Sequence, residues 1–273
     1  MLRACCSDLG LCGRRSTIER QSWRWDEILY LLGVADAFGT ALLDWVRGGT
    51  VPETIQRDDG YVEEGAGPDA YLAGLAAWPA AERRSLVHVR GRVADLGCGA
   101  GRTSVVLQQR GFDVVGLDVS ALAVRAARIF GVHAARLASA SAFHREISEF
   151  DTVVMFGNNF GMFGTPERAR QLLSRWATRA APGTRILAES TSAYGGGAPI
   201  TDRGYYRRNK ELGLAPGHTR LRIRYGDVTG PWTNWLFVSR AELRQIVRGT
   251  GWAIRSIVGE QIAEPYVTVL ERS

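Results

Sequence analysis

The sequence is poor in the features that mark membrane, disulfide-rich and metal-binding proteins. None of its apolar runs approaches the 18 or so residues of a membrane helix, which excludes a spanning protein. Four cysteines in 273 residues do not make a disulfide framework, so we expect reduced thiols and a cytoplasmic protein. The four histidines are scattered and the cysteines lack the spacing of zinc ligands, so no metal is expected.

Lysine is almost absent as well, because Lys210 is the single lysine of the chain. Arginine supplies the other basic residues, and the formal net charge is +6 without any block of five or six like charges. This pattern weakly permits a nucleic-acid partner but favours a solvated surface of arginine and glutamate. With 45% apolar and 23% charged residues, the composition is that of a folded globular chain, not a disordered one.

Short runs rich in Val, Leu and Ile alternate with helical patterns through the middle of the chain. Strands are predicted at 92–96, 113–118, 133–137, 151–156 and 185–189, and helices at 102–110, 120–130 and 166–179. This alternation predicts βαβ units in a parallel sheet that helices cover on both faces. A capping box, Ser239 with Glu242, predicts one more helix, and strands are expected at 252–258 and 266–271.

The segments on either side of this core follow other patterns. Helices are predicted at 22–45, 68–78 and 80–88, and an antiparallel pair of strands at 219–225 and 232–238. We therefore expect an α/β fold, a Rossmann-like seven-stranded, mostly parallel sheet with an N-terminal helical lid and an inserted antiparallel hairpin cap. Its parts are a flexible extension (1–20), the lid (21–90), the cofactor-binding core (91–190), the cap (191–238) and the closing helix and strands (239–273).

A glycine-rich loop carries the clearest functional signal. The run from Asp95 to Gly101, DLGCGAG, lies between a predicted strand and a predicted helix. Glycines let the backbone turn tightly and approach a ligand, and the positive end of the helix favours a carboxylate or phosphate. Asp118 ends the next strand, where a carboxylate can accept both hydroxyls of a ribose. The GxGxG spacing, with an acid two residues before it, disfavours the GxGxxG loop of NAD-binding proteins.

These residues, VADLGCGAGR followed by VVGLDVS, resemble motif I and the next strand of the class I S-adenosylmethionine (SAM) methyltransferases. The resemblance covers residues 92–189 and, more loosely, 239–271. It implies that Asp95 orients the methionine amino group or a water, that Gly97 and Gly99 pass under the cofactor, that Asp118 holds the ribose, and that Val119 packs on adenine. Where the family often has an acid near the adenine amino group, this chain has LASASAF. The further cofactor-binding candidates are Cys98, Arg102, Ser139, Phe156 and Gly157.

The segment that follows the fourth strand of the core, FGNNFGMFG, is similar to the corresponding region of the glycine N-methyltransferases. This similarity implies that Asn158 contacts the methyl acceptor; the alternative is that Asn158 and Asn159 only cap the next loop. The Asp/Asn-Pro-Pro-aromatic sequence of methyltransferases that act on base amino groups is absent, as are the paired cysteines of the cytosine-C5 type.

Four side chains complete the catalytic candidates as bases or orienting groups. Glu189, at the end of the fifth strand, is the best placed, with a supporting hydrogen-bonding role as its alternative. The others are Tyr61, Tyr205 and Tyr206. Aromatic residues are dense between 205 and 237, which suits an apolar or aromatic acceptor or the packing of the hairpin itself.

The function expected from these features is SAM-dependent methylation of a small molecule. The acceptor atom is an O, an N or an electron-rich C, in an aromatic or apolar natural product such as a bacterial secondary metabolite. Direct in-line displacement needs no metal, and S-adenosyl-L-homocysteine (SAH) is the product. The alternatives are an RNA methyltransferase, which the arginines favour, and a non-catalytic SAM-binding regulatory protein. We expect a monomer or homodimer with no membrane partner.

Overall fold

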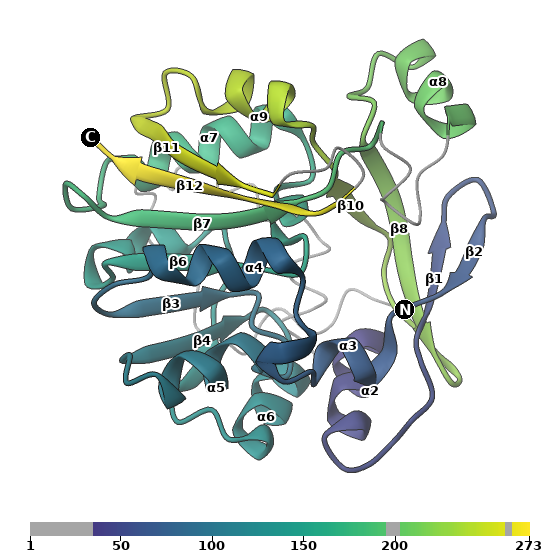
Figure 1. Ribbon diagram of the computed structural model, residues 1–273. Coiled ribbons are helices and arrows are strands. Elements are labelled where there is room, and N and C mark those ends of the chain that lie inside the picture. Colours follow the sequence, from purple (N-terminus) through teal and green to yellow (C-terminus); the bar gives the residue numbers. More distant parts are fainter. Residues whose placement is uncertain (1–34, 195–202, 260–263) are drawn as a thin grey trace, which may run out of the picture.

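The computed structural model describes residues 35–194, 203–259 and 264–273, and it contains two sheets (Figure 1). The larger sheet has seven strands in the order β11-β12-β7-β6-β3-β4-β5. Their bounds are Val93–Leu96 (β3), Val114–Asp118 (β4), Ala135–Leu137 (β5), Thr152–Met155 (β6), Arg185–Ser190 (β7), Trp252–Val258 (β11) and Tyr266–Arg272 (β12). Strands β3 to β7 run parallel to one another, while β12 is antiparallel to both β7 and β11. This confirms the predicted Rossmann-like sheet.

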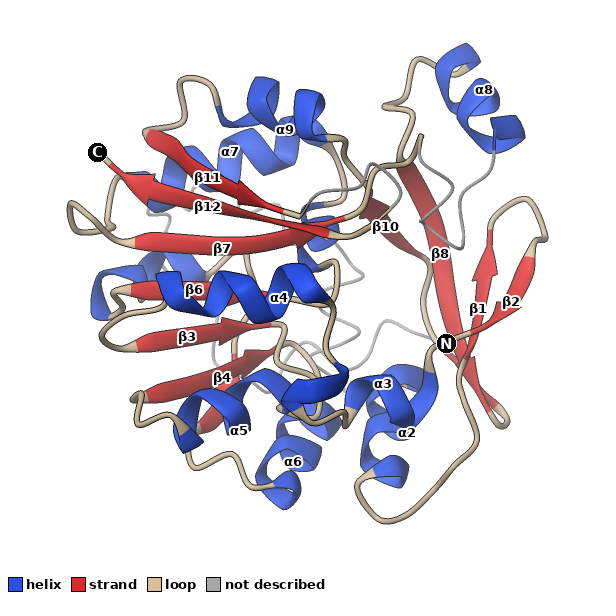
Figure 2. Cartoon of the chain, viewed as in Figure 1, coloured by secondary structure: helices blue, strands red, loops and turns tan. Residues whose placement is uncertain are grey.

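Helices cover both faces of this sheet, as the apolar strands require (Figure 2). On one face, α4 (Ala80–Ser85) and α5 (Arg102–Gln109) share a buried cluster with β3, β7 and β12. On the other face, α7 (Pro166–Ala177) and α9 (Arg240–Val247) close a larger cluster. Helix α6 (Ala121–Phe130) packs beside β4 and against α2 (Ala37–Trp45). The predicted capping box begins α9: Ser239 accepts from the Glu242 amide, and the Glu242 carboxylate accepts from Ser239.

The second sheet is antiparallel and faces the carboxyl ends of β3, β4, β6 and β7 (Figure 1). Its strands are Thr54–Arg57 (β1), Val62–Glu64 (β2), His218–Tyr225 (β8), Val228–Thr229 (β9) and Thr233–Leu236 (β10). The path runs β10-β8-β1-β2, with β9 paired to β8. The predicted antiparallel pairing within 219–238 is confirmed, because Trp235 stands opposite Thr219.

The flanking segments also contain elements that were not predicted. Between the predicted helices of the N-terminal segment, residues 54–57 and 62–64 form β1 and β2, and Ile55 of β1 pairs with Ile223 of β8. The hairpin therefore belongs to a separate sheet and does not lie on the edge of the large one. In addition, the polar stretch after residue 202 forms a helix, α8 (Arg203–Glu211).

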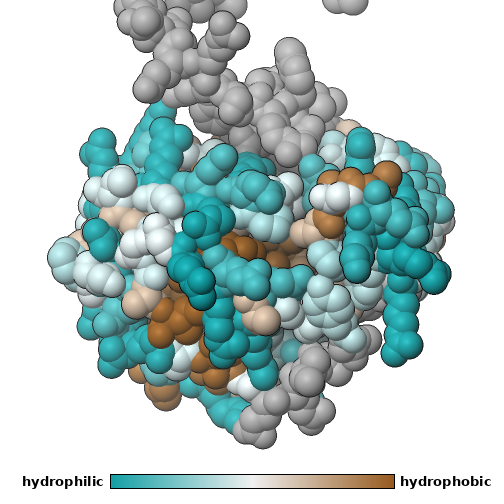
Figure 3. All heavy atoms as spheres, turned by 90° about the horizontal axis from the view of Figure 1, so that it is seen from above, coloured by the Kyte–Doolittle hydropathy of each residue, from teal (hydrophilic) through white to brown (hydrophobic). Residues whose placement is uncertain are grey.

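The remaining elements are short. The helix predicted at 68–78 is confirmed in part by α3 (Gly67–Tyr71) and the 3-10 turn η1 (Leu75–Ala77). The helix predicted at 80–88 consists of α4 and the 3-10 turn η2 (Leu86–His88). Turns η3 (Phe143–Arg145), η4 (Ile147–Glu149) and η5 (Asn159–Phe163) connect strands of the core. The predicted extension 1–20 and the predicted helix up to residue 34 lie outside the described residues. Seen from above, hydrophilic side chains cover most of the surface, with apolar patches between them (Figure 3).

Candidate functional site

The glycine loop joins β3 to α5 in the form that the sequence indicates. Gly97, Gly99 and Gly101 all have positive φ, at 78°, 54° and 91°. A Cβ on Gly97 would lie 2.6 Å from the Asn159 amide nitrogen and 2.7 Å from the Met162 methyl group. Gly97 is therefore required twice, for a backbone conformation that L side chains rarely adopt and for the close approach of the η5 turn.

Asp118 is a half-buried carboxylate that the backbone holds in one orientation. Its Oδ2 accepts the Gly99 N–H at 2.9 Å, and its Oδ1 accepts the Ser120 N–H at 2.9 Å. Burial raises the pKa of Asp118, and these backbone hydrogen bonds act against that rise. Because each carboxylate oxygen has two lone-pair sites, each keeps one for a ligand, which is what a ribose with two adjacent hydroxyls needs.

A cavity of about 230 Å³ lies at the carboxyl ends of β3, β4 and β5. Asp118 at the end of β4 and the loops that follow β3, β4 and β5 line one side of it, with Gly97, Gly99, Val119 and Ser139. All five are predicted cofactor-binding residues, so the structure brings half of that set of ten together. The other walls come from the start of α2, turn η5, strand β10 and Arg168 of α7, whose residues are not among the predicted cofactor-binding set. The cavity therefore lies between the two sheets.

The other predicted cofactor residues lie around the cavity and not in its lining. Asp95 is buried beneath the glycine loop and accepts the Ser104 hydroxyl at 2.7 Å; burial raises its pKa to about 6. Cys98 is turned into an apolar cluster beside α6, and burial raises its pKa. Phe156 packs edge-on against Trp78 in the core.

Arg102 and Gly157 contact a pair of buried glutamates, Glu82 and Glu189, at a point where four elements meet. Arg102 donates to both carboxylate oxygens of Glu82, at 2.8 and 3.0 Å. The Gly157 N–H points at two carboxyl groups at once: it donates to Oε1 of Glu82 at 3.2 Å and makes a shorter bond to Oε2 of Glu189. Glu189 also accepts the Asn158 N–H at 3.1 Å. Burial, and then the neighbouring Glu82, raise the pKa of Glu189 well above its ordinary value.

This geometry favours the supporting role for Glu189 over that of a base. A second carboxyl group at the same N–H, buried beside a single guanidinium, disfavours the charged form of Glu189. Arg102 bonds to Glu82 and not to Glu189, so Glu189 is the one of the two that more readily keeps a proton. A protonated carboxyl group that is bonded to two backbone amides fixes the turn after β6 and is poorly suited to accept a further proton.

The side chains of Asn158 and Asn159, in the turn after β6, point to different places. The Asn158 side chain accepts the Thr191 hydroxyl at 2.6 Å, and it is absent from the lining of the described cavity. Asn159 lines the cavity and donates to the Gly97 carbonyl at 2.9 Å. The side chain of this turn that faces the cavity is thus one residue later than the one predicted.

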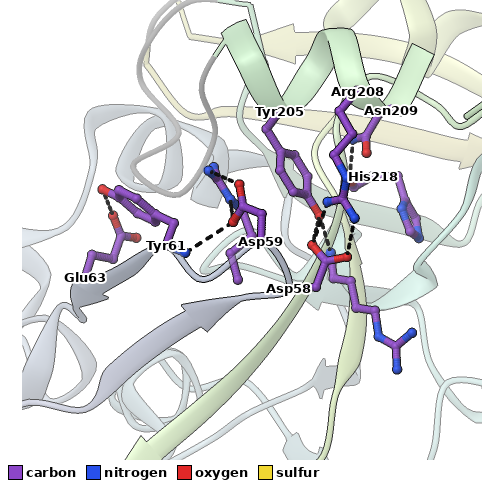
Figure 4. Close-up of polar contacts among 10 residues, drawn as sticks. Asp58, Asp59, Tyr61, Glu63, Tyr205, Arg208, Asn209 and His218 are labelled. Atoms are coloured by element: carbon purple, nitrogen blue, oxygen red, sulfur yellow. Dashed lines mark hydrogen bonds and ion pairs between the residues drawn. The ribbon is translucent and has the colours of Figure 1, made fainter. Parts of the chain in front are cut away.

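The tyrosines proposed as catalytic lie in the second sheet and α8, away from the cavity lining. The Tyr205 hydroxyl donates to Asp58 at 2.7 Å, and Arg208 pairs with the same carboxylate at 3.1 Å (Figure 4). Tyr61 is exposed and donates to Glu63 at 3.2 Å. Tyr206 packs in the small apolar cluster of Phe237 and Ala193. The contacts of Tyr205 and Arg208 with Asp58 tie α8 to the β1–β2 hairpin, whereas the Tyr61 bond lies within that hairpin.

Sequence reasoning missed several residues of the site. Asp36 caps α2 by accepting the Gly39 N–H at 2.8 Å, and it also accepts the Ser120 hydroxyl next to Asp118. Its signal was an acid just before a helical stretch, which the longer predicted helix obscured. Glu82 had no signal, because an acid in a short polar helix is ordinary.

No group of three or more potential metal ligands gathers within the described ranges. No helix in the described part of the chain is both long and apolar enough to cross a membrane.

Comparisons with known proteins agree with this geometry. Residues 93–183 match the family model of a methyltransferase domain. The curated proteins contain no match to the sequence. A SAM-dependent methyltransferase from Bacteroides fragilis, solved with SAH, is similar over 88% of this chain and 95% of its own, with 23% identity and a TM-score of 0.71.

Two further structures share the fold at lower similarity. A SAM-dependent methyltransferase from Methanosarcina mazei has 17% identity over 68% of this chain and 95% of its own, with a TM-score of 0.55. The CcbJ methyltransferase from Streptomyces caelestis has 13% identity over 73% and 98%, with a TM-score of 0.51. The similarity to glycine N-methyltransferases stays a prediction. The match to the methyltransferase-domain model covers residues 93–183, and the fold of the chain is the class I, Rossmann-like fold seen in these SAM-dependent methyltransferases.

Proposed function

We propose that this protein transfers the methyl group of SAM to a small molecule. The observation that carries the proposal is the cavity at the carboxyl ends of β3 and β4, where the backbone holds Asp118 beside the glycine loop. In open α/β sheets, ligands bind at this edge. The residues present fit a nucleoside cofactor, because Asp118 offers two acceptor sites while Val119 and Phe38 supply apolar walls.

Bound SAM would supply an activated methyl group, which moves from sulfur to the acceptor atom in one displacement and leaves SAH. The chain then has to align the acceptor and to keep water out. Gly97 allows η5 to approach the glycine loop closely, and Asn159 ties that turn to the loop. Glu189 and Glu82 fix the turn after β6 through the Gly157 amide.

The acceptor is proposed to be an aromatic or apolar natural product, such as a bacterial secondary metabolite, methylated on O, N or an electron-rich C. Support comes from the walls of the cavity, where Phe38, Met162 and Trp235 offer apolar surface. The cytoplasmic location and the monomer or homodimer stay predictions from the sequence.

An RNA acceptor is the second candidate, and the exposed Arg220 and Arg224 of β8 favour it. Other arginines of this region already have partners: Arg222 bonds to Gln56 at 2.9 Å, and Arg208 pairs with Asp58. Partners within the protein reduce the charge left to contact a phosphate backbone, so we favour the small molecule.

The test is transfer of labelled methyl from SAM into an extract of the host, separated into small molecules, RNA and protein. We expect label among the small molecules, and none with the Asp118→Ala variant. Label in RNA would replace the acceptor class with the second candidate. SAH binding without any transfer would point to a regulatory protein, and absence of SAH binding by calorimetry would refute the proposal altogether.

A further inference from the structure

Strand β10 lies directly on the methyltransferase core, although it belongs to the second sheet. Trp235 of β10 packs on Gly161 of turn η5, where any Cβ would collide with the indole ring. A Cβ on Gly164, just after that turn, would lie 3.3 Å from the Asn234 carbonyl oxygen. Gly230, three residues before β10, lies beside Ala35 and Ala37 at the start of α2. The segment from Gly230 to Trp235 therefore runs from the start of α2 to η5, and Thr233, Asn234 and Trp235 line the cavity on the way.

Thr233, the first residue of β10, has an unusual polar atom. Its side-chain oxygen is buried and has no hydrogen-bond partner among the described residues. Thr233 also lines the cavity that contains Asp118, Val119 and Ser139. A buried hydroxyl without a partner costs free energy, and native proteins rarely leave one in that condition unless a ligand or an ordered water satisfies it.

We propose that Thr233 binds the cofactor, with its hydroxyl hydrogen-bonded to the nucleoside end of SAM. This inference rests on the proposed function. The nucleoside is the part of SAM that suits this cavity, because Asp118 offers acceptors for two adjacent hydroxyls and Val119 and Ala138 offer apolar walls for a purine. A hydroxyl both donates and accepts, so it can pair with a purine ring nitrogen or with the exocyclic amine.

The consequence is that the second sheet is part of the cofactor site as well as a cover for the acceptor. Thr233 pairs in register with Leu221 of β8, and β8 pairs with β1. A hydrogen bond from Thr233 to the cofactor therefore connects this sheet to the bound nucleoside. Cofactor binding is then expected to stabilise the contact between β10 and η5.

The test compares Thr233→Val with Thr268→Val, two identical changes of chemistry. Valine is close in shape to threonine and lacks the hydroxyl. Thr268 of β12 is the matched control, because its oxygen is also buried without a partner among the described residues and it is absent from the cavity lining. Thr233→Ser, which keeps the hydroxyl, is the conservative variant.

Binding is measured by calorimetry with SAH and with 5′-methylthioadenosine, which lacks the amino-acid part. Thr233→Val should raise Kd for both ligands by roughly tenfold, the effect of one lost hydrogen bond. Thr268→Val and Thr233→Ser should bind like the wild type. Without ligand, Thr233→Val should melt no lower than the wild type, since it removes an unsatisfied group, and its stabilisation by SAH should shrink.

Unchanged Kd values for Thr233→Val with both ligands would overturn the inference. A loss restricted to SAH would overturn it too, because the contact would then be with the amino-acid end. These outcomes differ from failure of the proposed function, in which the wild-type protein itself would not bind SAH.

Discussion

Replacing a buried glutamate by glutamine is predicted to have a small effect on stability at Glu189 and a large one at Glu82. Glu189→Gln places an amide where the protonated carboxyl group stands. Its oxygen can still accept the Gly157 and Asn158 N–H groups, and its NH₂ can donate to Glu82. Glu82→Gln instead removes the negative partner of Arg102, which now bonds to both oxygens of Glu82.

The expected free energies of unfolding follow from these contacts. Glu189→Gln preserves every hydrogen bond of the group, so the change should stay within about 1 kcal/mol. Glu82→Gln breaks an ion pair in which the Glu82 side chain is 1% exposed and the Arg102 side chain 16%. Removing one member of a buried pair costs about 3–5 kcal/mol, and the partial exposure of Arg102 favours the lower value.

The assay is urea unfolding followed by tryptophan fluorescence, with the midpoint and slope measured from pH 4.5 to 8. Because the folded pKa of Glu189 lies above its unfolded value, its stabilising contribution is complete below that unfolded value and is lost as the pH rises through the folded pKa. The glutamine variant lacks this loss, so its stability relative to the wild type should improve with rising pH. Equal destabilisation by both variants, or a pH-independent difference between Glu189→Gln and wild type, would refute the assigned proton.

Three further predictions concern the cavity and its surroundings. Asp118→Asn should weaken SAH binding at least tenfold and lower the free energy of unfolding by about 1–3 kcal/mol, as measured by calorimetry and urea unfolding. The reason is that its NH₂ must face one of the two backbone N–H groups that now donate to the carboxylate. Gly161→Ala should cost more than about 1 kcal/mol by pushing Trp235 away, whereas Gly74→Ala, with open space around it, should have little effect on the thermal midpoint. Tyr205→Phe should cost about 1–2 kcal/mol and leave methyl transfer intact, since its hydroxyl bonds to Asp58 and to the Arg220 N–H, away from the cavity lining; a large loss of kcat would restore it as a catalytic candidate.

Much of the core was predictable because its signals are local. A strand, three glycines and a helix in succession define the loop at Gly97–Gly101, and the acid that ends β4 is found by its distance from that loop. The capping box at Ser239 needs only four residues. In each case the physical cause and the sequence signal lie within one supersecondary unit.

The second sheet and the buried glutamates depend on contacts between distant segments. Strand β1 has a mixed polar sequence, Thr-Ile-Gln-Arg, and becomes a strand because β8 offers it an open edge. Glu82 and Glu189 meet only because α4 packs near the end of β7. Tyr205 illustrates the same limit. Its aromatic ring suggested a catalytic cap, whereas burial and the hydrogen bond to Asp58 raise its pKa to about 12, and the hydroxyl is a structural donor to Asp58.

The backbone explains why Asn159, and not Asn158, faces the cavity. Gly157 and Asn158 both have positive φ, at 71° and 60°. Two consecutive residues of this kind turn their N–H groups to the same side, and here both N–H groups donate to Glu189. The turn directs the Asn158 side chain to Thr191 and leaves Asn159 to face the cavity. The buried carboxyl group that fixes the turn thus also selects which asparagine reaches the site, and a change at Glu189 that loses both amides should disturb cofactor binding through Asn159.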